Sequence, residues 1–458
     1  MKSLPTRLTL LRNAANVRSS LSNSLYGAAE YVALPLILLL ATPFLLHRLG
    51  LAQFGLWMLA SAAVTSSSLI SAGFGDAAIK YAAAYRGDGD RQRVQHTLRV
   101  NLTINLALGT LLAILLWWGS PYAARSMFKI DSSLQGSAVT AFRIGSAILL
   151  VRCFESVLTG ALRAHERYGP AAQINVLSRA AVILAACVLA SRGHGIVAIM
   201  IATLCGVIAS ALSQMLAVHG LLGSLWLLPS FDRAAMSEVF SYGCFSWVQA
   251  VSGCIFNQAD RLLIGALLGA ASVGYYSVCV QAAQPIHGLI AAGLHFLFPH
   301  LSARLAKAPA PELRRVVLSA FHLNAVAAAV LCIPLVLFSK TILRLWMGAP
   351  FASQAWPLLS IIAVGFGLLA LNVTGHYTLL ALAQVRLVAM LNLAGGAAML
   401  LVMFLVIPRF GLTGAAIGRL VYGPITLLMY GRLRALLSPH TAARPSAFSE
   451  LAIPATER

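Results

Sequence analysis

Charged residues are scarce in this chain of 458 residues. Only 10% of its residues are charged, whereas 59% are hydrophobic and the mean hydropathy is +0.82. A soluble protein of this size needs far more polar side chains to cover its surface. The composition therefore excludes a soluble globular protein and predicts a membrane protein with many spans.

Acidic residues are especially rare, because 13 Asp and Glu stand against 33 Lys and Arg. The basic residues occur in short, scattered clusters and form no basic domain, which argues against nucleic-acid binding. In a membrane protein such an excess is typical of cytoplasmic loops and of attraction to anionic lipids. Anionic membrane lipid is therefore an expected partner.

Signatures of catalysis and of metal or nucleotide binding are missing. The 7 cysteines lie in apolar stretches without CxxC spacing, and no HExxH, Walker A or nucleophile-elbow motif occurs. No connection between apolar stretches is long enough to form a catalytic domain. We therefore expect a transporter rather than an enzyme, with no metal, no cofactor and no ATP-driven step.

Twelve apolar stretches are long enough to cross about 30 Å of hydrocarbon. The sequence thus predicts an all-α polytopic membrane protein with about twelve transmembrane helices in two six-helix lobes. The predicted parts are a cytoplasmic amphipathic segment at 1–24, a first lobe at 25–223, a second lobe at 224–435 and a disordered cytoplasmic tail at 436–458. The termini and even-numbered connections hold about three times as many Lys and Arg as the opposite connections, which places both termini in the cytoplasm.

Two turns recur at a spacing of about 219 residues. The segment 49–57 matches 268–276, with glycines at the same two positions, and the turn at 193–195 corresponds to 409–414. Because each predicted half also holds six spans, the chain is interpreted as a duplication.

Eight ionisable residues lie within the predicted spans. A charge near the centre of a membrane helix costs about 2.5–3.5 kcal/mol on insertion scales, so most of them must face a polar interior. They are Glu30, Arg143, Arg152, Glu155, Arg179, Asp260, Arg261 and Arg419. Five arginines against three carboxylates make that interior net positive, and arginine suits bidentate contacts to phosphate. The pattern favours a phosphorylated substrate over a cationic drug.

The fourth predicted span holds three charged residues, and helical spacing divides them into a pair and a single residue. Arg152 and Glu155 are three residues apart and share a helix face, so we expect them to form a structural ion pair. Arg143 lies nine residues before Arg152, on the opposite side of a straight helix, and has no acidic residue nearby. It is therefore a candidate for substrate binding.

Asp260 and Arg261 are adjacent and point about 100° apart on a helix, so each needs its own partner. Asn257 shares a face with Asp260, and Gln258 shares one with Arg261. The depth of the pair in the seventh span makes Asp260 a gating or coupling candidate and Arg261 a substrate-binding candidate. Glu30, one turn into the first span, is a second coupling candidate, with pairing to a basic residue of a neighbouring helix as the alternative.

The other substrate-binding candidates are polar residues of later spans. Arg179 follows Asn175 by four residues and forms one polar stripe with it, with a hydrogen bond to a backbone carbonyl as the alternative. Arg419 lies near one end of the twelfth span, where it could instead extend to the periplasmic headgroups. Gln281 and Gln284 are candidates for contacts to sugars.

Several segments, spread over almost the whole chain, are typical of one protein family. They are the turn at 49–57, GFGDAAIKY at 73–81, ADRLLIGALLGAASVGYYS at 259–277, FPHLSARLA at 298–306 and FGLTGAAIG at 410–418. In this order and spacing they resemble the polysaccharide-flippase (Wzx-type) branch of the multidrug/oligosaccharidyl-lipid/polysaccharide (MOP) exporter superfamily. The resemblance implies a V-shaped, pseudo-two-fold, MATE-like transporter whose lobes rock about a central cavity.

In that branch the cargo is an oligosaccharide on undecaprenyl pyrophosphate. The resemblance implies a flippase of the bacterial inner membrane that carries this lipid from the cytoplasmic to the periplasmic leaflet by alternating access, for O-antigen (lipopolysaccharide), capsule or exopolysaccharide. It also implies the polysaccharide polymerase and chain-length proteins of the same pathway as partners. The alternatives are a cation-coupled drug antiporter of the same fold, a peptidoglycan-precursor flippase, which carries two further helices, and a polytopic glycosyltransferase or polymerase using the same lipid.

Overall fold

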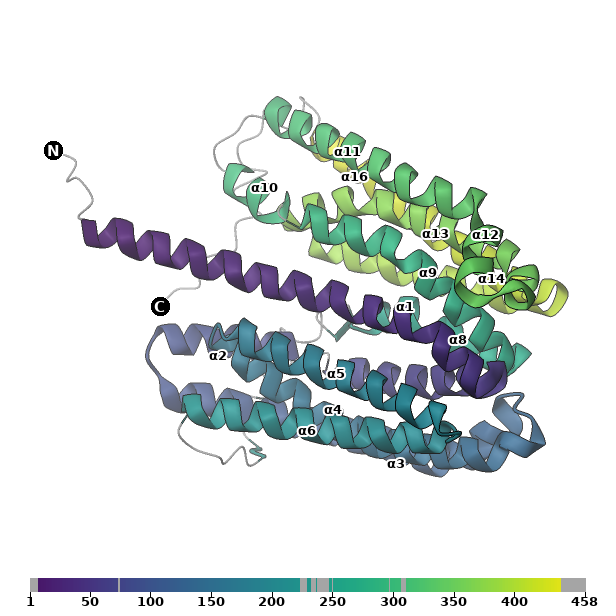
Figure 1. The fold of residues 1–458 in the computed structure, drawn as a ribbon. Helices are drawn as coiled ribbons and strands as arrows, with labels where there is room; N and C mark the ends of the chain where they lie inside the picture. The colour runs from purple at the N-terminus through teal and green to yellow at the C-terminus, as the bar shows by residue number, and fades with distance from the viewer. Residues whose placement is uncertain are drawn as a thin grey trace. The chain divides into compact units, whose positions relative to one another are not determined.

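The computed structural model describes residues 7–72, 75–222, 229–231, 236, 247–248, 250–295, 297–305 and 310–437. Every regular element within these residues is helical (Figure 1). Eight helices in this part of the chain are long and apolar enough to cross a membrane. The prediction of an all-α polytopic membrane protein is therefore confirmed.

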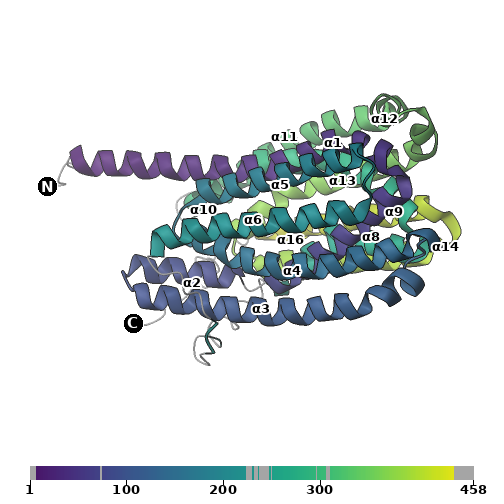
Figure 2. The same ribbon diagram turned by 60° about the horizontal axis from the view of Figure 1, so that its bottom comes forward.

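The chain divides into two compact units that alternate along the sequence. The first unit comprises Met1–Gly50, Ala63–Ala124 and Ser132–Ala250. Its helices are most of α1 (Arg7–Ala72), α2 (Gly75–Gly87), α3 (Arg91–Tyr122), α4 (Gln135–Ala164), α5 (Tyr168–Ser191) and α6 (Ile196–Leu222), with a short 3-10 turn at Ser132–Leu134. In this unit α4 packs on α3 and α6, and α5 packs on α6 (Figure 2).

The second unit comprises Leu51–Ala62, Arg125–Asp131 and Val251–Arg458. Its elements begin with a π-helical turn, η3 (Ile255–Ala259). The helices that follow are α8 (Asp260–Leu268), α9 (Ala270–Leu294), α10 (Leu297–Leu305), α11 (Ala310–Leu337), α12 (Ser339–Met347), α13 (Ala349–Ala381), α14 (Val385–Leu420), α15 (Tyr422–Leu427) and α16 (Met429–Leu436). Another π turn, at Ala123–Met127, spans a boundary between the two units in the sequence. Helix α13 lies at its centre, because 72% of its apolar 18-residue stretch is buried, whereas only 17% of the corresponding stretch of α11 is buried. The short segments 51–62 and 125–131 belong to this unit, although the predicted lobe boundary placed them in the first.

Glycines with positive φ angles bend two of the longest helices. Gly50 (φ 77°) interrupts α1, and Gly411 (φ 56°) interrupts α14. Only glycine adopts such angles without a steric penalty, so the chain kinks at these points between two helical parts. Each of these two helices therefore holds parts of two predicted spans. Since some predicted spans extend outside the described residues, the number twelve stays a prediction.

The two matched turns have the same backbone conformation. Gly50 has φ 77° and ψ 162°, and Gly269, at the corresponding position of the second half, has φ 87° and ψ 175°. The second glycines of the two turns lie close together within the second unit: a Cβ at Gly274 would be 3.5 Å from the Cα of Gly55. The absence of side chains at both positions lets the backbones of α1 and α9 approach.

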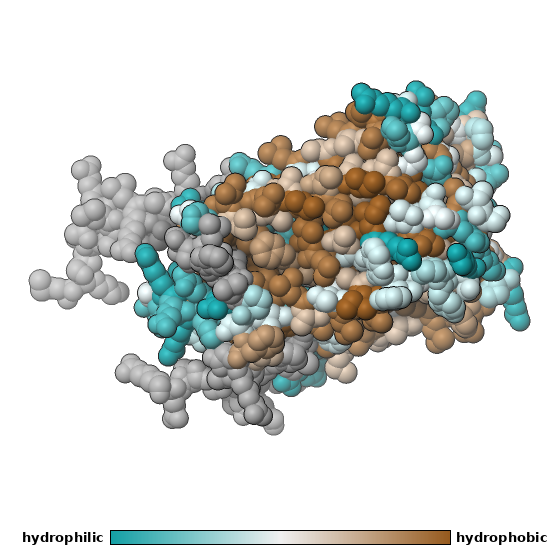
Figure 3. All heavy atoms as spheres, turned by 90° about the horizontal axis from the view of Figure 1, so that it is seen from below, coloured by the Kyte–Doolittle hydropathy of each residue, from teal (hydrophilic) through white to brown (hydrophobic). Residues whose placement is uncertain are grey.

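The surface matches the predicted membrane environment. On the face shown in Figure 3 hydrophobic residues form a broad band, and hydrophilic residues gather toward the two ends. Side chains up to residue 32 and all residues after 437 lie outside the described part of the structure. The amphipathic character of the segment 1–24 and the disorder of the tail therefore stay predictions.

We predict that Gly55→Ala destabilises the protein. A Cβ at this position would lie 1.8 Å from the carbonyl oxygen of Ala270, and backbone cannot yield as a flexible side chain can. Overpacking of this kind costs about 1–3 kcal/mol, so the midpoint of thermal unfolding in detergent should fall. Gly119→Ala is the matched control, because a Cβ at Gly119 meets nothing within 4 Å. Equal midpoints for the two variants would contradict the predicted close approach.

Candidate functional site

Asp260 and Arg419 form a buried ion pair in the second unit. Their side chains are only 1% and 4% exposed, and the Nη1 of Arg419 contacts the Oδ2 of Asp260. The hydroxyl of Tyr276 donates a hydrogen bond to the same carboxylate oxygen at 2.7 Å and accepts one from the Nη1 of Arg419 at 3.0 Å. Three helices, α8, α9 and α14, are thus joined by one charged cluster inside the unit.

The cluster also explains how the adjacent Arg261 is accommodated. Its Nη1 donates to the Oε1 of Gln258 at 3.0 Å, and its backbone N–H donates to the Oδ1 of Asp260 at 2.8 Å. The two neighbouring charges therefore have separate side-chain partners, as their angular separation requires. Gln258 belongs to the π-helical turn η3, a local feature that is frequent at functional sites.

The position of Arg419 differs from both interpretations made from the sequence. Its guanidinium is buried, lies 4.6 Å from the ring centroid of Phe366 on α13, and is held by Asp260 and Tyr276. It therefore does not extend to headgroups, and its Nη1 contacts both Asp260 and Tyr276. The physical reason is that a buried carboxylate in an apolar interior must have a cationic partner. Arg419 thus has a structural contact inside this unit, and its role in substrate binding stays a prediction.

A second polar network lies in the first unit, between α4, α5 and α6. Arg152 Nη1 lies 2.9 Å from the Oε2 of Glu155, whose other oxygen accepts a hydrogen bond from Ser210. The amide of Gln214 donates to the Oδ1 of Asn175 at 2.9 Å. The carboxylate of Glu155 is thus satisfied by residues of two helices, and the expected ion pair is present as one part of this network.

Spacing explains the local part of this network. Ser210 and Gln214 are four residues apart, so they share one face of the very apolar helix α6. Neither was singled out from the sequence. A pair of polar residues at helical spacing in such an apolar helix is the signal that could have identified them. Thr159 of α4 completes the connection by donating to the Oε1 of Gln214 at 2.7 Å.

Asn175 and Arg179, predicted to form one polar stripe, differ in their environments. Asn175 is buried and held by Gln214, whereas Arg179 is exposed. Arg143 is also exposed, and its guanidinium lies 5.2 Å from the ring centroid of Trp117. Exposed tryptophans are typical of the membrane interface, so the contact with Trp117 favours a position of Arg143 near that level.

The remaining candidates are divided between the helices of the second unit and the N-terminal segment. Gln281 is buried on α9, with its amide 3.7 Å from the sulfur of Met58, and Gln284, on the same helix, is half-buried. Glu30 lies within α1, but its side chain is outside the described residues. Its coupling role stays a prediction. Among the described residues no group of three or more His, Cys, Asp and Glu could hold a metal ion.

Comparison with known proteins identifies the family. The model of a family described as polysaccharide biosynthesis protein matches residues 46–355, which is more than half of the chain. The chain belongs to this family. The family recognised from the sequence is thereby confirmed.

Two curated proteins are similar to this chain over long stretches. A protein of Shigella flexneri described as a candidate O-antigen transporter is 22% identical over 87% of this chain and 94% of its own length. The uncharacterized membrane protein EpsK of Bacillus subtilis is 23% identical over 70% of this chain and 63% of its own length. These similarities favour a transporter over an enzyme.

Solved structures show the same fold. An inward-facing multidrug resistance transporter of the MATE family, within the MOP superfamily, matches with a TM-score of 0.75 and 16% identity over 93% of this chain and 100% of that chain. A MOP superfamily transporter from Pyrococcus furiosus matches with a TM-score of 0.55 and 16% identity over 90% of this chain and 96% of that chain. The MATE-like fold predicted from the sequence is confirmed.

We predict strong coupling between Asp260 and Arg419. Asp260→Asn leaves the guanidinium of Arg419 buried without its counter-charge, which should cost about 3–5 kcal/mol. Arg419→Gln should cost a similar amount, since it leaves the carboxylate unpaired. The double variant removes both charges and should be more stable than the sum of the single effects predicts. Thermal unfolding in detergent measures all three variants, and strictly additive shifts would contradict the buried pair.

We also predict that Glu155→Gln destabilises the protein more than Glu166→Gln. Both acids pair with an arginine, but the side chain of Glu155 is 5% exposed and that of Glu166 is 64% exposed. Loss of the buried carboxylate should cost about 1–3 kcal/mol, whereas an exposed pair contributes less than about 1 kcal/mol. Parallel unfolding curves compare the two. A larger effect at Glu166 would show that the network around Glu155 does not hold α4 and α6 together.

Proposed function

We propose that this protein is a flippase for lipid-linked oligosaccharides. It moves units attached to undecaprenyl pyrophosphate from the cytoplasmic to the periplasmic leaflet, where polymerase and chain-length proteins of the same pathway would use them. The family match over residues 46–355 carries this proposal. The similarity to the Shigella flexneri protein over 94% of that protein's length supports it.

The charges inside the membrane segments fit an anionic headgroup. Five arginines and three carboxylates occur there in the sequence, and the two carboxylates whose side chains are described each hold one arginine, Glu155 with Arg152 and Asp260 with Arg419. The remaining charge is therefore positive. Arginine is well suited to the paired oxygens of a pyrophosphate, whereas a positive interior disfavours a cationic drug.

Four arginines are the candidates for pyrophosphate contacts, and the buried Arg419 among them already holds Asp260. Arg143 and Arg179 are exposed residues of the first unit, and Arg261 belongs to the second. The amides of Gln281 and Gln284 are candidates for sugar hydroxyls, because amides can both donate and accept hydrogen bonds. Asn175 accepts a hydrogen bond from Gln214 and stays a candidate for substrate binding.

Alternating access is the mechanism that a duplicated membrane fold of this kind supports. The arginines would hold the pyrophosphate while the polyprenyl tail stays in the bilayer, so only the polar part of the substrate must cross. Asp260 and Glu30 remain the gating or coupling candidates. The buried contacts of Asp260 with Arg419 and Tyr276 join α8, α9 and α14, so a change at this residue would act on all three helices.

We predict that Arg179→Gln lowers flipping of the lipid-linked oligosaccharide by roughly 10- to 100-fold, the value of one lost charge-assisted contact. Arg179→Lys should be intermediate, because it keeps the charge but loses the planar pair of donors. In a deletion strain, the readout is lipid-linked oligosaccharide that accumulates in the cytoplasmic leaflet, with surface polysaccharide and protein level measured in parallel.

Arg192→Gln is the matched control, since Arg192 is an exposed arginine in the turn after α5 and has no proposed contact to substrate. Full activity of the Arg179 and Arg143 glutamine variants would remove the pyrophosphate-binding assignment. Normal surface polysaccharide in the deletion strain without a second flippase would defeat the flippase proposal itself. Exchange of a cationic drug for protons or cations by the purified protein in liposomes would favour the antiporter instead.

A further inference from the structure

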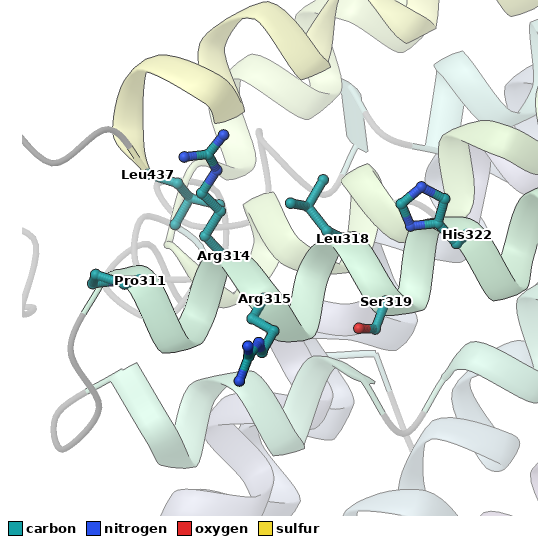
Figure 4. A pocket seen from close by; sticks show the side chains of 7 residues that line it. All are labelled: Pro311, Arg314, Arg315, Leu318, Ser319, His322 and Leu437. Atoms are coloured by element: carbon teal, nitrogen blue, oxygen red, sulfur yellow. The ribbon is translucent and has the colours of Figure 1, made fainter.

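A basic pocket opens at the start of α11, away from the charged clusters described above. It encloses about 420 Å³. Its lining residues are Pro311, Arg314, Arg315, Leu318, Ser319, His322 and Leu437. Figure 4 shows that six of them come from the first turns of α11 and that Leu437 lies just after α16. The pocket therefore combines two arginines, a histidine and a hydroxyl group on one helix.

Helical spacing brings these polar groups together in two adjacent rows. Arg314, Leu318 and His322 follow one another at intervals of four residues, and Arg315 and Ser319 form the neighbouring row. All five residues are exposed. Their position on the outside of α11 leaves the two guanidinium groups accessible to a ligand.

The opposite face of α11 fixes this orientation. Leu313 and Val317 are 5% and 4% exposed and belong to a hydrophobic cluster with residues of α10, α13 and α16. Asn324, further along the same face, is buried and donates hydrogen bonds to the carbonyl of Ala370 and the hydroxyl of Thr374 on α13. Because the inner face is packed and hydrogen-bonded, the helix cannot rotate its arginines inward without breaking these contacts.

Beyond the pocket the same outer face becomes entirely apolar. The large exposed side chains are Leu323 (64%), Val326 (62%), Val330 (64%), Ile333 (54%) and Leu337 (71%). From Leu318 to Leu337 the helix rises about 29 Å at 1.5 Å per residue, which is close to the roughly 30 Å of bilayer hydrocarbon. Arg314 lies one turn before Leu318, so the two arginines are at the level of the lipid headgroups.

The acidic residue nearest in sequence does not neutralise the pocket. Glu312 pairs with Arg304 of α10 at 3.4 Å. Among the described residues, no carboxylate forms an ion pair with Arg314 or Arg315. The pocket is therefore positively charged where it meets the apolar face.

We propose that this pocket binds the phosphate headgroup of an anionic phospholipid such as phosphatidylglycerol. Arg314 and Arg315 contact the phosphate, Ser319 and His322 offer further hydrogen-bond donors, and the acyl chains lie along the apolar face from Leu323 onward. A free anion would use the charges but not the adjoining apolar face, which is why a lipid fits better. The bound lipid belongs to the surrounding leaflet, so the proposal does not rest on the transported substrate.

The arginine distribution predicts that this leaflet is the cytoplasmic one. The start of α11 and Leu437, just after α16, both line this pocket, and the predicted connections on this side are rich in Lys and Arg. Basic pockets between helices on this side are typical binding places for anionic lipid headgroups.

The test uses the purified full-length protein in detergent and native mass spectrometry with added phosphatidylglycerol. Arg314→Gln/Arg315→Gln should weaken the binding of the tightest phosphatidylglycerol by about 30-fold, as expected for two basic groups near a headgroup. The single variants should show smaller losses and serve if the double variant does not fold. Arg432→Gln/Arg434→Gln is the matched control, because it removes the same charge from exposed positions of α16 that do not line the pocket.

The expected pattern is loss in the pocket variant, wild-type binding in the control, and no effect on binding of neutral phosphatidylcholine. Equal binding of phosphatidylglycerol by the wild type and the pocket variant would overturn the proposal. Displacement of phosphatidylglycerol by millimolar inorganic phosphate would also overturn it, since the site would then recognise a free anion. Preferential binding of undecaprenyl phosphate at the same arginines would replace the phospholipid by the substrate lipid.

Discussion

An ionised carboxylate inside an apolar interior requires a cationic partner, and much of this structure can be understood from that requirement. The penalty for burying an unpaired charge is several kcal/mol, which is comparable to the whole stability of many domains. Asp260 is 1% exposed and Glu155 is 4% exposed. Each is held by an arginine and by at least one hydroxyl group. The two pairs therefore determine which helices must stay together.

The two units meet this requirement with different geometries. In the first, Arg152 and Glu155 lie one turn apart on α4, and α6 supplies the hydrogen bonds that complete the carboxylate. In the second, the partner of Asp260 comes from a helix 159 residues later in the chain. The first arrangement stabilises one helix and attaches a second to it, whereas the other can form only after α8, α9 and α14 have assembled.

The arginines of the membrane segments also differ in burial. Arg419 is buried and its Nη1 holds the carboxylate of Asp260, so it contributes to the fold by joining α14 to α8. An exposed arginine such as Arg179 lies where a ligand can reach it. On the outside of α11 the same chemistry has a third use, because arginines beyond the apolar face are positioned for headgroups rather than for cargo.

The sequence by itself determined what depends on local spacing and composition. Apolar stretches gave the helical membrane fold, the three-residue interval indicated the pair of Arg152 with Glu155, and the matched glycines indicated that Gly50 and Gly269 form equivalent turns. Only the tertiary structure decided what Asp260 pairs with and which arginines stay exposed. The reason is that helical periodicity gives the direction of a side chain from its own helix, whereas its partner depends on how distant helices pack around it.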